Sequence, residues 1–396
     1  MFLLKVSGSQ WVNRWLAVGG IFLALASGTC AAAGEQERNS PIRFGSVNTL
    51  SGPVQWPQSS ETVQAYFDLI NAEGGIKGRK LELIVKDDKG DPAEAARAAN
   101  QLVEKQGVLA MVGSASIVDC ATNADLYRRA GVFSIQGTGI EPECFTSSHV
   151  VPVNTGPYLS TRNGLQFAHD VAKSVRPCVV LLDIPGTRAA YDAVINGWSQ
   201  ESGVRLALVL RYGAGADMKA LVQQADSSRC DAVVHTGIEP HVLEWVHAVE
   251  ELGLLAQVPT VFLTPAYTKN VAAELKSTKV KVFSMAEFEP WSSRSLSLLD
   301  WRALLRRAKI PTSSFSQGGY VSAQVLVGAL RSIEGDLTRE SVSAALRSVE
   351  GLELTMLGVP FSIGSRSQHN PNRAALPMRL DKGFWRIASG FWVVAP

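Results

Sequence analysis

The residues that could carry out chemistry are few, and their spacing does not form a catalytic site. The sequence has no G-x-S-x-G nucleophile turn, no G-x-x-x-x-G-K-[ST] phosphate loop and no H-E-x-x-H metal motif. Gly213-Ala214-Gly215 is followed by Met218 where a dinucleotide-binding loop needs glycine. His235, His241 and His247 are six residues apart, so no two share a helical face for a metal ion, and we expect them at strand ends or on the surface.

Two further observations argue against an enzyme. Asp87 and Asp88 could form a general acid–base pair, but neighbouring residues in a strand point to opposite sides, so we expect a solvated strand end. A hydrolase on an α/β fold would need a nucleophile with a partnered base, and the sequence shows none. We therefore predict a protein that is not an enzyme and that has no cofactor and no metal.

Residues 1–33 have the features of a cleavable signal peptide. Lys5 and Arg14 accompany an uncharged stretch, Trp15–Ala26, which is shorter than a membrane span. Ala31-Ala32-Ala33 then supplies small residues for cleavage. These features predict export to the periplasm.

Two alternatives remain open for this segment. One is a retained membrane anchor, and the other is a lipid anchor on Cys30, although Ser27 and Thr29 replace the Leu and the small residue of a usual lipobox. Removal of residues 1–33 from the 396 leaves 363 residues, four of the five cysteines and, with two basic residues lost from a net charge of +2, no net charge. Such a chain, without a Lys/Arg-rich run or a later membrane span, predicts a soluble monomer that does not bind nucleic acid.

Short apolar strands alternate with amphipathic helices from Pro41 onward, in two series. This β-α alternation predicts an α/β protein with two doubly wound parallel-sheet lobes. The predicted strands are Ile42–Val47, Leu81–Val85, Val108–Val112 and Val132–Ile135 in the first series, and Cys178–Leu182, Leu206–Leu210, Ala232–Val234 and Val258–Leu263 in the second.

The C-terminal part departs from this alternation. Helices are predicted first, and then three short strands whose three-residue turns favour an antiparallel meander. We expect a multi-strand hinge, with lobe I formed by residues 41–156 plus 286–360 and lobe II by residues 157–285 plus 361–396. The predicted helices are Leu296–Arg307, Tyr320–Ser332 and Arg339–Ser348, and the strands are Met378–Leu380, Phe384–Ile387 and Phe391–Val394.

The four cysteines of the exported chain permit three pairings in an oxidising compartment, or four free thiols. Cys120 and Cys144 follow the carboxyl ends of neighbouring strands of the first series. Cys178 opens the first strand of the second series and Cys230 precedes the third, and such strands are often parallel neighbours. We predict one disulfide in each lobe, Cys120–Cys144 and Cys178–Cys230.

The chain resembles the type I periplasmic solute-binding proteins of ABC importers, in particular the leucine/isoleucine/valine-binding group. The resemblance covers residues 42–145 most strongly. It implies two lobes that close on a small solute by a hinge, and delivery of that solute to an ABC permease in the inner membrane. The residues that carry it are Asn48–Pro53, the Ile70–Arg79 stretch I-N-A-E-G-G-I-K-G-R, Leu81-Glu82-Leu83, Asp87–Pro92 and Val112-Gly113.

The resemblance also implies where the solute lies. It places the solute at the carboxyl ends of the strands, between the loops Leu50–Gln58, Gly113–Val118, Gly137–Glu141, Thr236–Glu239 and Pro265–Tyr267. The predicted binding residues on these loops are Ser51, Trp56, Ser114, Ser116, Ile117, Thr138, Gly139, Thr236, Glu239 and Tyr267.

Three positions differ from the pattern of the family members that bind α-amino acids. Those proteins have a hydroxyl residue, a Thr and an acidic residue where this chain has Ile117, Ile140 and Ala266. A buried ammonium without a carboxylate partner is unfavourable, so we expect an aromatic or apolar organic acid or amide. An amino-acid site rebuilt around Glu239 or Glu141, and a sensor for a membrane signalling protein, are the alternatives.

Overall fold

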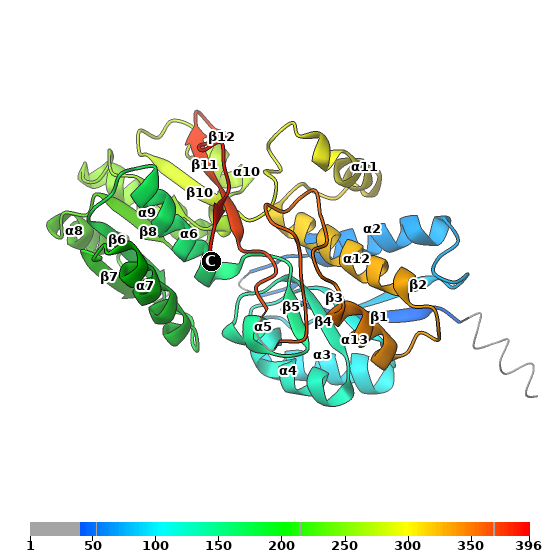
Figure 1. The fold of residues 1–396 in the computed structure, drawn as a ribbon. Coiled ribbons are helices and arrows are strands. Elements are labelled where there is room, and N and C mark those ends of the chain that lie inside the picture. Colours follow the sequence, from blue (N-terminus) through cyan, green and yellow to red (C-terminus); the bar gives the residue numbers. More distant parts are fainter. Residues whose placement is uncertain (1–39, 53, 214, 367–368) are drawn as a thin grey trace, which may run out of the picture.

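Two lobes, each built on its own sheet, make up the protein in a computed structural model that describes residues 40–396 apart from 53, 214, 367 and 368 (Figure 1). The predicted signal peptide, residues 1–33 with Cys30, lies outside the described residues. Among the helices of the described part, none has the length and apolar character needed to cross a membrane. The expected fold class, two α/β lobes with parallel sheets, is confirmed.

The first lobe contains a parallel sheet with the strand order β2-β1-β3-β4-β5. Helices α2 and α12 cover one face of this sheet, and α3 and α4 cover the other. The strands are β1 (Ile42–Asn48), β2 (Leu81–Asp87), β3 (Ala110–Ala115), β4 (Phe133–Thr138) and β5 (Val150–Pro152). The helices are α2 (Gln58–Ala72), α3 (Pro92–Asn100, continued by a π-helical turn over Gln101–Lys105), α4 (Asp119–Ala130), α5 (Pro142–Thr146), α11 (Leu299–Ala308), α12 (Ser314–Ser332) and α13 (Arg339–Arg347).

The second lobe has an eight-stranded sheet in which β6 to β10 are parallel and β11 to β13 are antiparallel additions. The strands are β6 (Pro177–Leu182), β7 (Leu208–Tyr212), β8 (Ala232–His235), β9 (Thr260–Phe262), β10 (Val282–Ala286), β11 (Ala374–Asp381), β12 (Phe384–Ile387) and β13 (Val393–Val394). The helices are α6 (Gly156–Asp170), α7 (Arg188–Ser202), α8 (Met218–Ser227), α9 (Glu239–Leu252) and α10 (Lys269–Glu274), with a 3-10 turn at Thr264–Ala266. A second 3-10 turn, Leu296–Leu298, leads directly into α11 of the first lobe.

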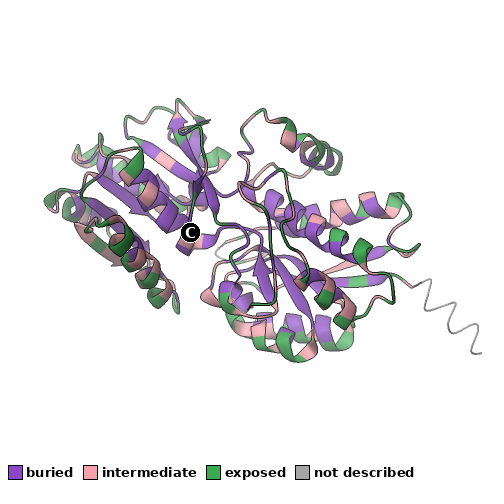
Figure 2. Ribbon diagram, in the orientation of Figure 1, coloured by how far each residue is buried: buried purple, intermediate pink, exposed green. Residues whose placement is uncertain are grey.

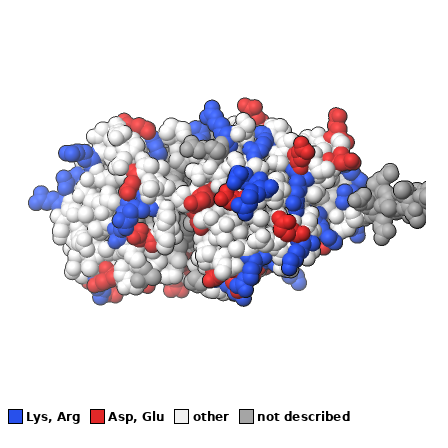
Figure 3. Space-filling model, turned by 90° about the horizontal axis from the view of Figure 1, so that it is seen from below, with Lys and Arg blue, Asp and Glu red and all other residues white. Residues whose placement is uncertain are grey.

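The central strands of each sheet are buried on both faces, as their runs of apolar residues predicted, whereas the edge strands β7 and β12 are partly exposed (Figure 2). In β3, Val112 belongs to the core cluster that includes Phe67 of α2, whereas its neighbour Met111 belongs to the other cluster, which includes Leu102. Figure 3 shows that acidic and basic side chains are interspersed over the face that it presents.

The end of the chain differs from the predicted meander. The hairpin of β11 and β12 is present, but β13 pairs with Ala374 and Ala375 of β11 and not with β12. The reason is that β12 covers only the residues from Met378 to Asp381, which leaves the first residues of β11 free to pair. Val393 of β13 then becomes buried against the core of the lobe.

Helix α12 begins six residues earlier than predicted, because Gly318 and Gly319 are inside the helix. A methyl group added at Gly318 would lie 2.1 Å from the carbonyl oxygen of Gly137, and one at Gly319 would lie 2.1 Å from that of Ser59. The helix therefore contacts β4 and α2 backbone to backbone. Glycine is required by this close approach.

Both predicted disulfides are formed. Cys120 and Cys144 join α4 to α5 with a Cα–Cα distance of 5.1 Å, and Cys178 and Cys230 are joined at 5.7 Å. The second bridge follows from the pairing of β6 with β8, which are parallel neighbours.

Three chain segments connect the lobes, and Glu287 lies where they meet. The connections run from β5 to α6, from β10 to α11 and from α13 to β11. The Glu287 carboxylate accepts hydrogen bonds from the Gly156 amide at 2.8 Å and the Ser160 hydroxyl at 3.0 Å. Its main-chain oxygen accepts one from Asn372 Nδ2 at 2.8 Å. Burial raises the pKa of Glu287, against the effect of these hydrogen bonds.

The substitution Glu287→Ala is expected to lower the free energy of unfolding by about 2–4 kcal/mol, since the Gly156 amide and the Ser160 hydroxyl would be left buried without an acceptor. Urea unfolding measures this loss. Glu289→Ala is the matched control and should lower the free energy of unfolding by less than about 1 kcal/mol, because among the described residues the Glu289 carboxylate accepts a hydrogen bond from the Ser293 hydroxyl alone. Equal losses in the two variants would contradict a central role for Glu287.

Candidate functional site

The predicted loops collect at one edge of each sheet. Those of the first lobe follow β1, β3 and β4, which are adjacent, and those of the second follow β8 and β9, which are also adjacent. The carboxyl end of β5 leads at once into α6, and that of β10 leads directly into Glu287. Both edges therefore adjoin the connections between the lobes, the usual position of binding sites in such sheets.

Asp87 and Asp88 hold the loop after β1 in place. The Asp87 carboxylate accepts hydrogen bonds from the Ser51 hydroxyl at 2.6 Å and the Leu50 amide at 2.9 Å. Asp88 accepts one from the Thr49 hydroxyl at 2.8 Å and is fully buried. The prediction of a solvated strand end is therefore wrong, because both carboxylates accept hydrogen bonds from the loop after β1. The Ser51 hydroxyl donates its proton to Asp87.

Trp56 forms an aromatic pair with Phe315. The ring centroids are 5.1 Å apart with an interplanar angle of 16°, and both side chains are half-buried. Phe315 is not among the predicted binding residues, because the sequence pattern predicts a helix that begins only at Tyr320. The capping box of Ser313 and Ser316 was the signal that could have placed this helix start correctly.

The three predicted residues at the end of β3 occupy different positions. Ser114 is within β3 and buried, and its hydroxyl oxygen accepts the Val47 amide at 3.1 Å, so it serves the pairing of β1 and β3. Ser116 accepts the amides of Val118 and Asp119 and so holds the turn that leads into α4. Ile117 is half-buried.

The loop after β4 offers one uncommitted hydroxyl. Thr138 is half-buried, and its hydroxyl has no hydrogen-bond partner within the described ranges. The amide of Gly139 donates to Asn154 Oδ1 at 2.8 Å, so this amide is already used. Tyr158 donates its hydroxyl to the carbonyl oxygen of Ile140 at 3.0 Å.

Glu141 places its carboxylate at the beginning of α4. Its Oε2 accepts the Ala121 amide at 3.0 Å, and its side chain is 9% exposed. Burial raises the pKa of Glu141 to about 7, although hydrogen bonds from the Ala121 and Cys120 amides favour the ionised form. Cys120, Glu141 and Cys144 bring their ligand atoms within 4.8 Å, but the two sulfurs are bonded to each other and are not thiolates that could hold a metal.

On the second lobe, the predicted residues Thr236 and Glu239 form hydrogen bonds with other residues of the same lobe. Thr236 is 7% exposed and accepts the Leu182 amide at 2.9 Å. Glu239 accepts hydrogen bonds from Thr268 at 2.6 Å and Asn270 at 2.7 Å, which ties α9 to α10.

Tyr267 is covered by the connection that follows β10. Its ring lies 4.6 Å from that of Trp291, its hydroxyl is 2.7 Å from Ser292 Oγ, and only 2% of the residue is exposed. Its neighbour Ala266 is fully buried. The structure thus places Tyr267 within an aromatic cluster, away from the surface of the lobe.

His235 is at the end of β8, as expected, but it is fully buried. Burial lowers its pKa to about 3, and Nδ1 accepts the Gly237 amide at 3.0 Å. The side chain is therefore a neutral imidazole. Its ring lies 5.0 Å from that of Trp245, so it is part of the core.

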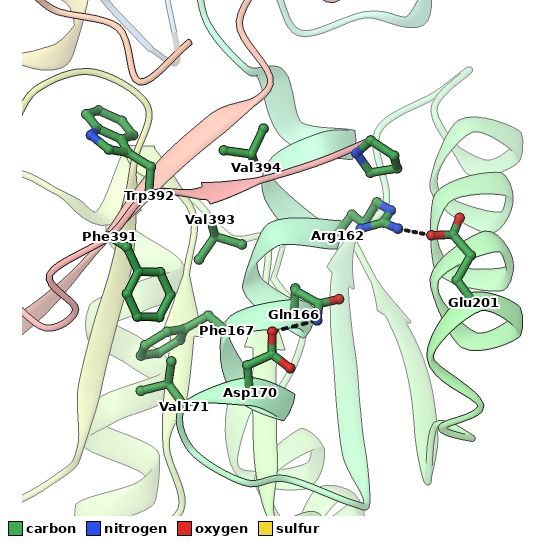
Figure 4. Close-up of a pocket in the computed structure, with 11 residues that line it drawn as sticks. Arg162, Gln166, Phe167, Asp170, Val171, Glu201, Phe391, Trp392, Val393 and Val394 are labelled. Atoms are coloured by element: carbon green, nitrogen blue, oxygen red, sulfur yellow. Dashed lines mark hydrogen bonds and ion pairs between the residues drawn. The ribbon is translucent and has the colours of Figure 1, made fainter.

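A pocket of about 400 Å³ lies elsewhere on the second lobe, between α6, α7 and the end of the chain (Figure 4). Its lining includes Phe391, Trp392 and Arg162, which pairs with Glu201. None of the predicted binding residues lines it. We therefore keep the two sheet edges as the candidate site.

Comparison with known proteins identifies relatives along the chain. Residues 41–384 match a family described as "Periplasmic binding protein". The Leu/Ile/Val/Thr-binding protein of Salmonella typhimurium is 26% identical over 237 residues, which are 58% of this chain and 63% of that protein. The matched part therefore spans less than two thirds of that relative.

Solved structures show the same fold. A branched-chain amino acid transporter substrate binding protein from Streptococcus pneumoniae, in complex with isoleucine, has a TM-score of 0.72 and 19% identity, covering 90% of this chain and 100% of its own. A fatty acid ABC transporter substrate-binding protein from Thermomonospora curvata has a TM-score of 0.76 and 19% identity, covering 88% and 92%.

The raised pKa of Glu141 predicts a pH-dependent stability. Its stabilising contribution is complete below the ordinary pKa of 4.5 and is lost as the pH rises through about 7. Glu141→Gln cannot titrate, so its free energy of unfolding relative to the natural protein should rise by up to about 3 kcal/mol across this range. Urea unfolding of both proteins at several pH values measures the difference, and a constant difference would contradict the prediction.

Proposed function

Because the chain belongs to the periplasmic binding protein family, we propose that it is an extracytoplasmic receptor that captures a small organic solute between its lobes and delivers it to an ABC permease. The family match over residues 41–384, together with the two-lobe fold, is the observation that supports this proposal. The loops of both lobes adjoin the connections. A solute that contacts both would favour a closed arrangement over an open one by its extra contacts.

The proposed solute is an aromatic or apolar organic acid or amide and not a standard amino acid. Ile117 and Ile140 are half-buried apolar residues on the first lobe, and Ala266 is fully buried on the second. Trp56 and Phe315 add an aromatic surface. The two structural neighbours described above are named for isoleucine and for fatty acid, so the fold by itself leaves the solute open.

Native mass spectrometry of protein purified without denaturation tests the proposal. We expect a non-covalent adduct of a small molecule that is lost on mild activation. A thermal-shift panel of amino acids, organic acids and amides then identifies the class. Binding of leucine with no response to the other classes would replace the proposed solute by an amino acid, and turnover of a bound solute would contradict a receptor function.

Trp56→Ala should weaken binding of an aromatic solute by about tenfold or more, because the Trp56–Phe315 pair would lose its larger ring. Isothermal titration calorimetry measures the affinity. Trp392→Ala is the control, since Trp392 packs against Gly358 outside the predicted loops and should leave the affinity unchanged. Unchanged affinity in Trp56→Ala would show that the aromatic pair does not contact the solute.

A further inference from the structure

The first turn of α4 would be an anion site if its amides were free. The first amides of a helix have no partner within the helix, and the helix dipole favours negative charge there. Here the Ala121 amide donates to Glu141 Oε2 at 3.0 Å, and the Cys120 amide also bonds to the Glu141 side chain. A carboxylate of the chain itself thus occupies the position that a carboxylate of a solute would take.

Covalent and hydrogen bonds fix Glu141 in this position. The Cys120–Cys144 disulfide joins the helix that receives the carboxylate to the helix that follows Glu141. The Cys144 amide donates to the Glu141 carbonyl oxygen at 3.0 Å, and Pro142 begins α5. The main chain of Glu141 is therefore held by α5, and its carboxylate is held by the α4 amides. A solute would have to displace this carboxylate to reach those amides.

The charged groups with the largest effects on the pKa of Glu141 are both negative. Asp119 on α4 and Glu143 on α5 raise its pKa, and the Tyr158 hydroxyl on α6 feels the Glu141 charge in turn. A second carboxylate brought to this place would meet the like charge of these groups and of Glu141 itself.

We propose that Glu141 determines solute specificity at the first lobe, so that the solute presents N–H donors, as an amide or an amine, and not a carboxylate. The inference rests on the proposed receptor function and revises its solute class: the amide is kept, the acid is excluded and an amine is added. The isoleucines at 117 and 140 accommodate the apolar body of such a solute. A carboxylate accepts hydrogen bonds and offers none, which suits N–H groups.

Matched solutes test this specificity. Titration calorimetry at about pH 8 would compare phenylacetamide, benzylamine and phenylacetate, and the corresponding set with a branched aliphatic body. We expect the amide and the amine to bind at least about tenfold more tightly than the acid. In Glu141→Gln, the affinity for the acid should rise about tenfold and the affinity for the amine should fall about tenfold. General damage to the fold would not produce opposite changes for the two solutes. Glu143→Gln, which removes the neighbouring carboxylate on α5, should leave the order of affinities unchanged.

The natural protein offers a second measurement without a substitution. Lowering the pH from about 8 to about 5.5 protonates Glu141 and should reduce the preference for the amine over the acid. If the acid binds most tightly, and the order of affinities is the same in Glu141→Gln, the proposed role of Glu141 is wrong. The receptor function would be unaffected by that result. An empty protein in native mass spectrometry that binds no panel member would overturn the receptor function, and this inference with it.

Discussion

Glu287 is a carboxylate with almost no access to water, and the segments that join the two lobes are bonded to it. It accepts the amide at the start of α6, and its own carbonyl oxygen holds the segment that leads into β11. A buried carboxylate is costly unless its acceptor capacity is used, so these bonds must form together. Both candidate sheet edges adjoin these connections, so the bonds of Glu287, together with the bond from the Thr155 hydroxyl to the carbonyl oxygen of Ala374, help to set the relative position of the binding loops.

The polar groups of the first lobe are largely used to shape its loops. Asp87 and Asp88 hold the loop after β1, Asn154 holds the amide of Gly139, and Glu141 caps α4. In the proposed site, the groups left for a solute are mainly the Thr138 hydroxyl, the Glu141 carboxylate, aliphatic side chains and one aromatic pair. The proposed solute class rests on this internal use of polar groups as much as on the apolar residues themselves.

Periodicity predicted the β-α order and both disulfides, because parallel strands and their helices are local patterns that repeat along the chain. Strand β7 extends from Leu208 to Tyr212 and was expected too early, and the short strands β5 and β10 were missed. The start of α12 was missed because Gly318 and Gly319 look unfavourable for a helix until the neighbouring backbone is known. The roles of Phe315 and Glu141 depend on contacts across the lobe, to which no local pattern corresponds.

The composite construction of the first lobe has a consequence for the order in which the protein folds. Helix α2 packs against α12, yet 242 positions separate Ala72 from Ser314 along the chain. The face of α2 that packs on β2 and β3 can be covered by early parts of the chain, but the face that packs on α12 can be covered only after most of the second lobe has emerged. The Cys120–Cys144 bridge, with a sequence separation of 24, needs only residues that precede α12.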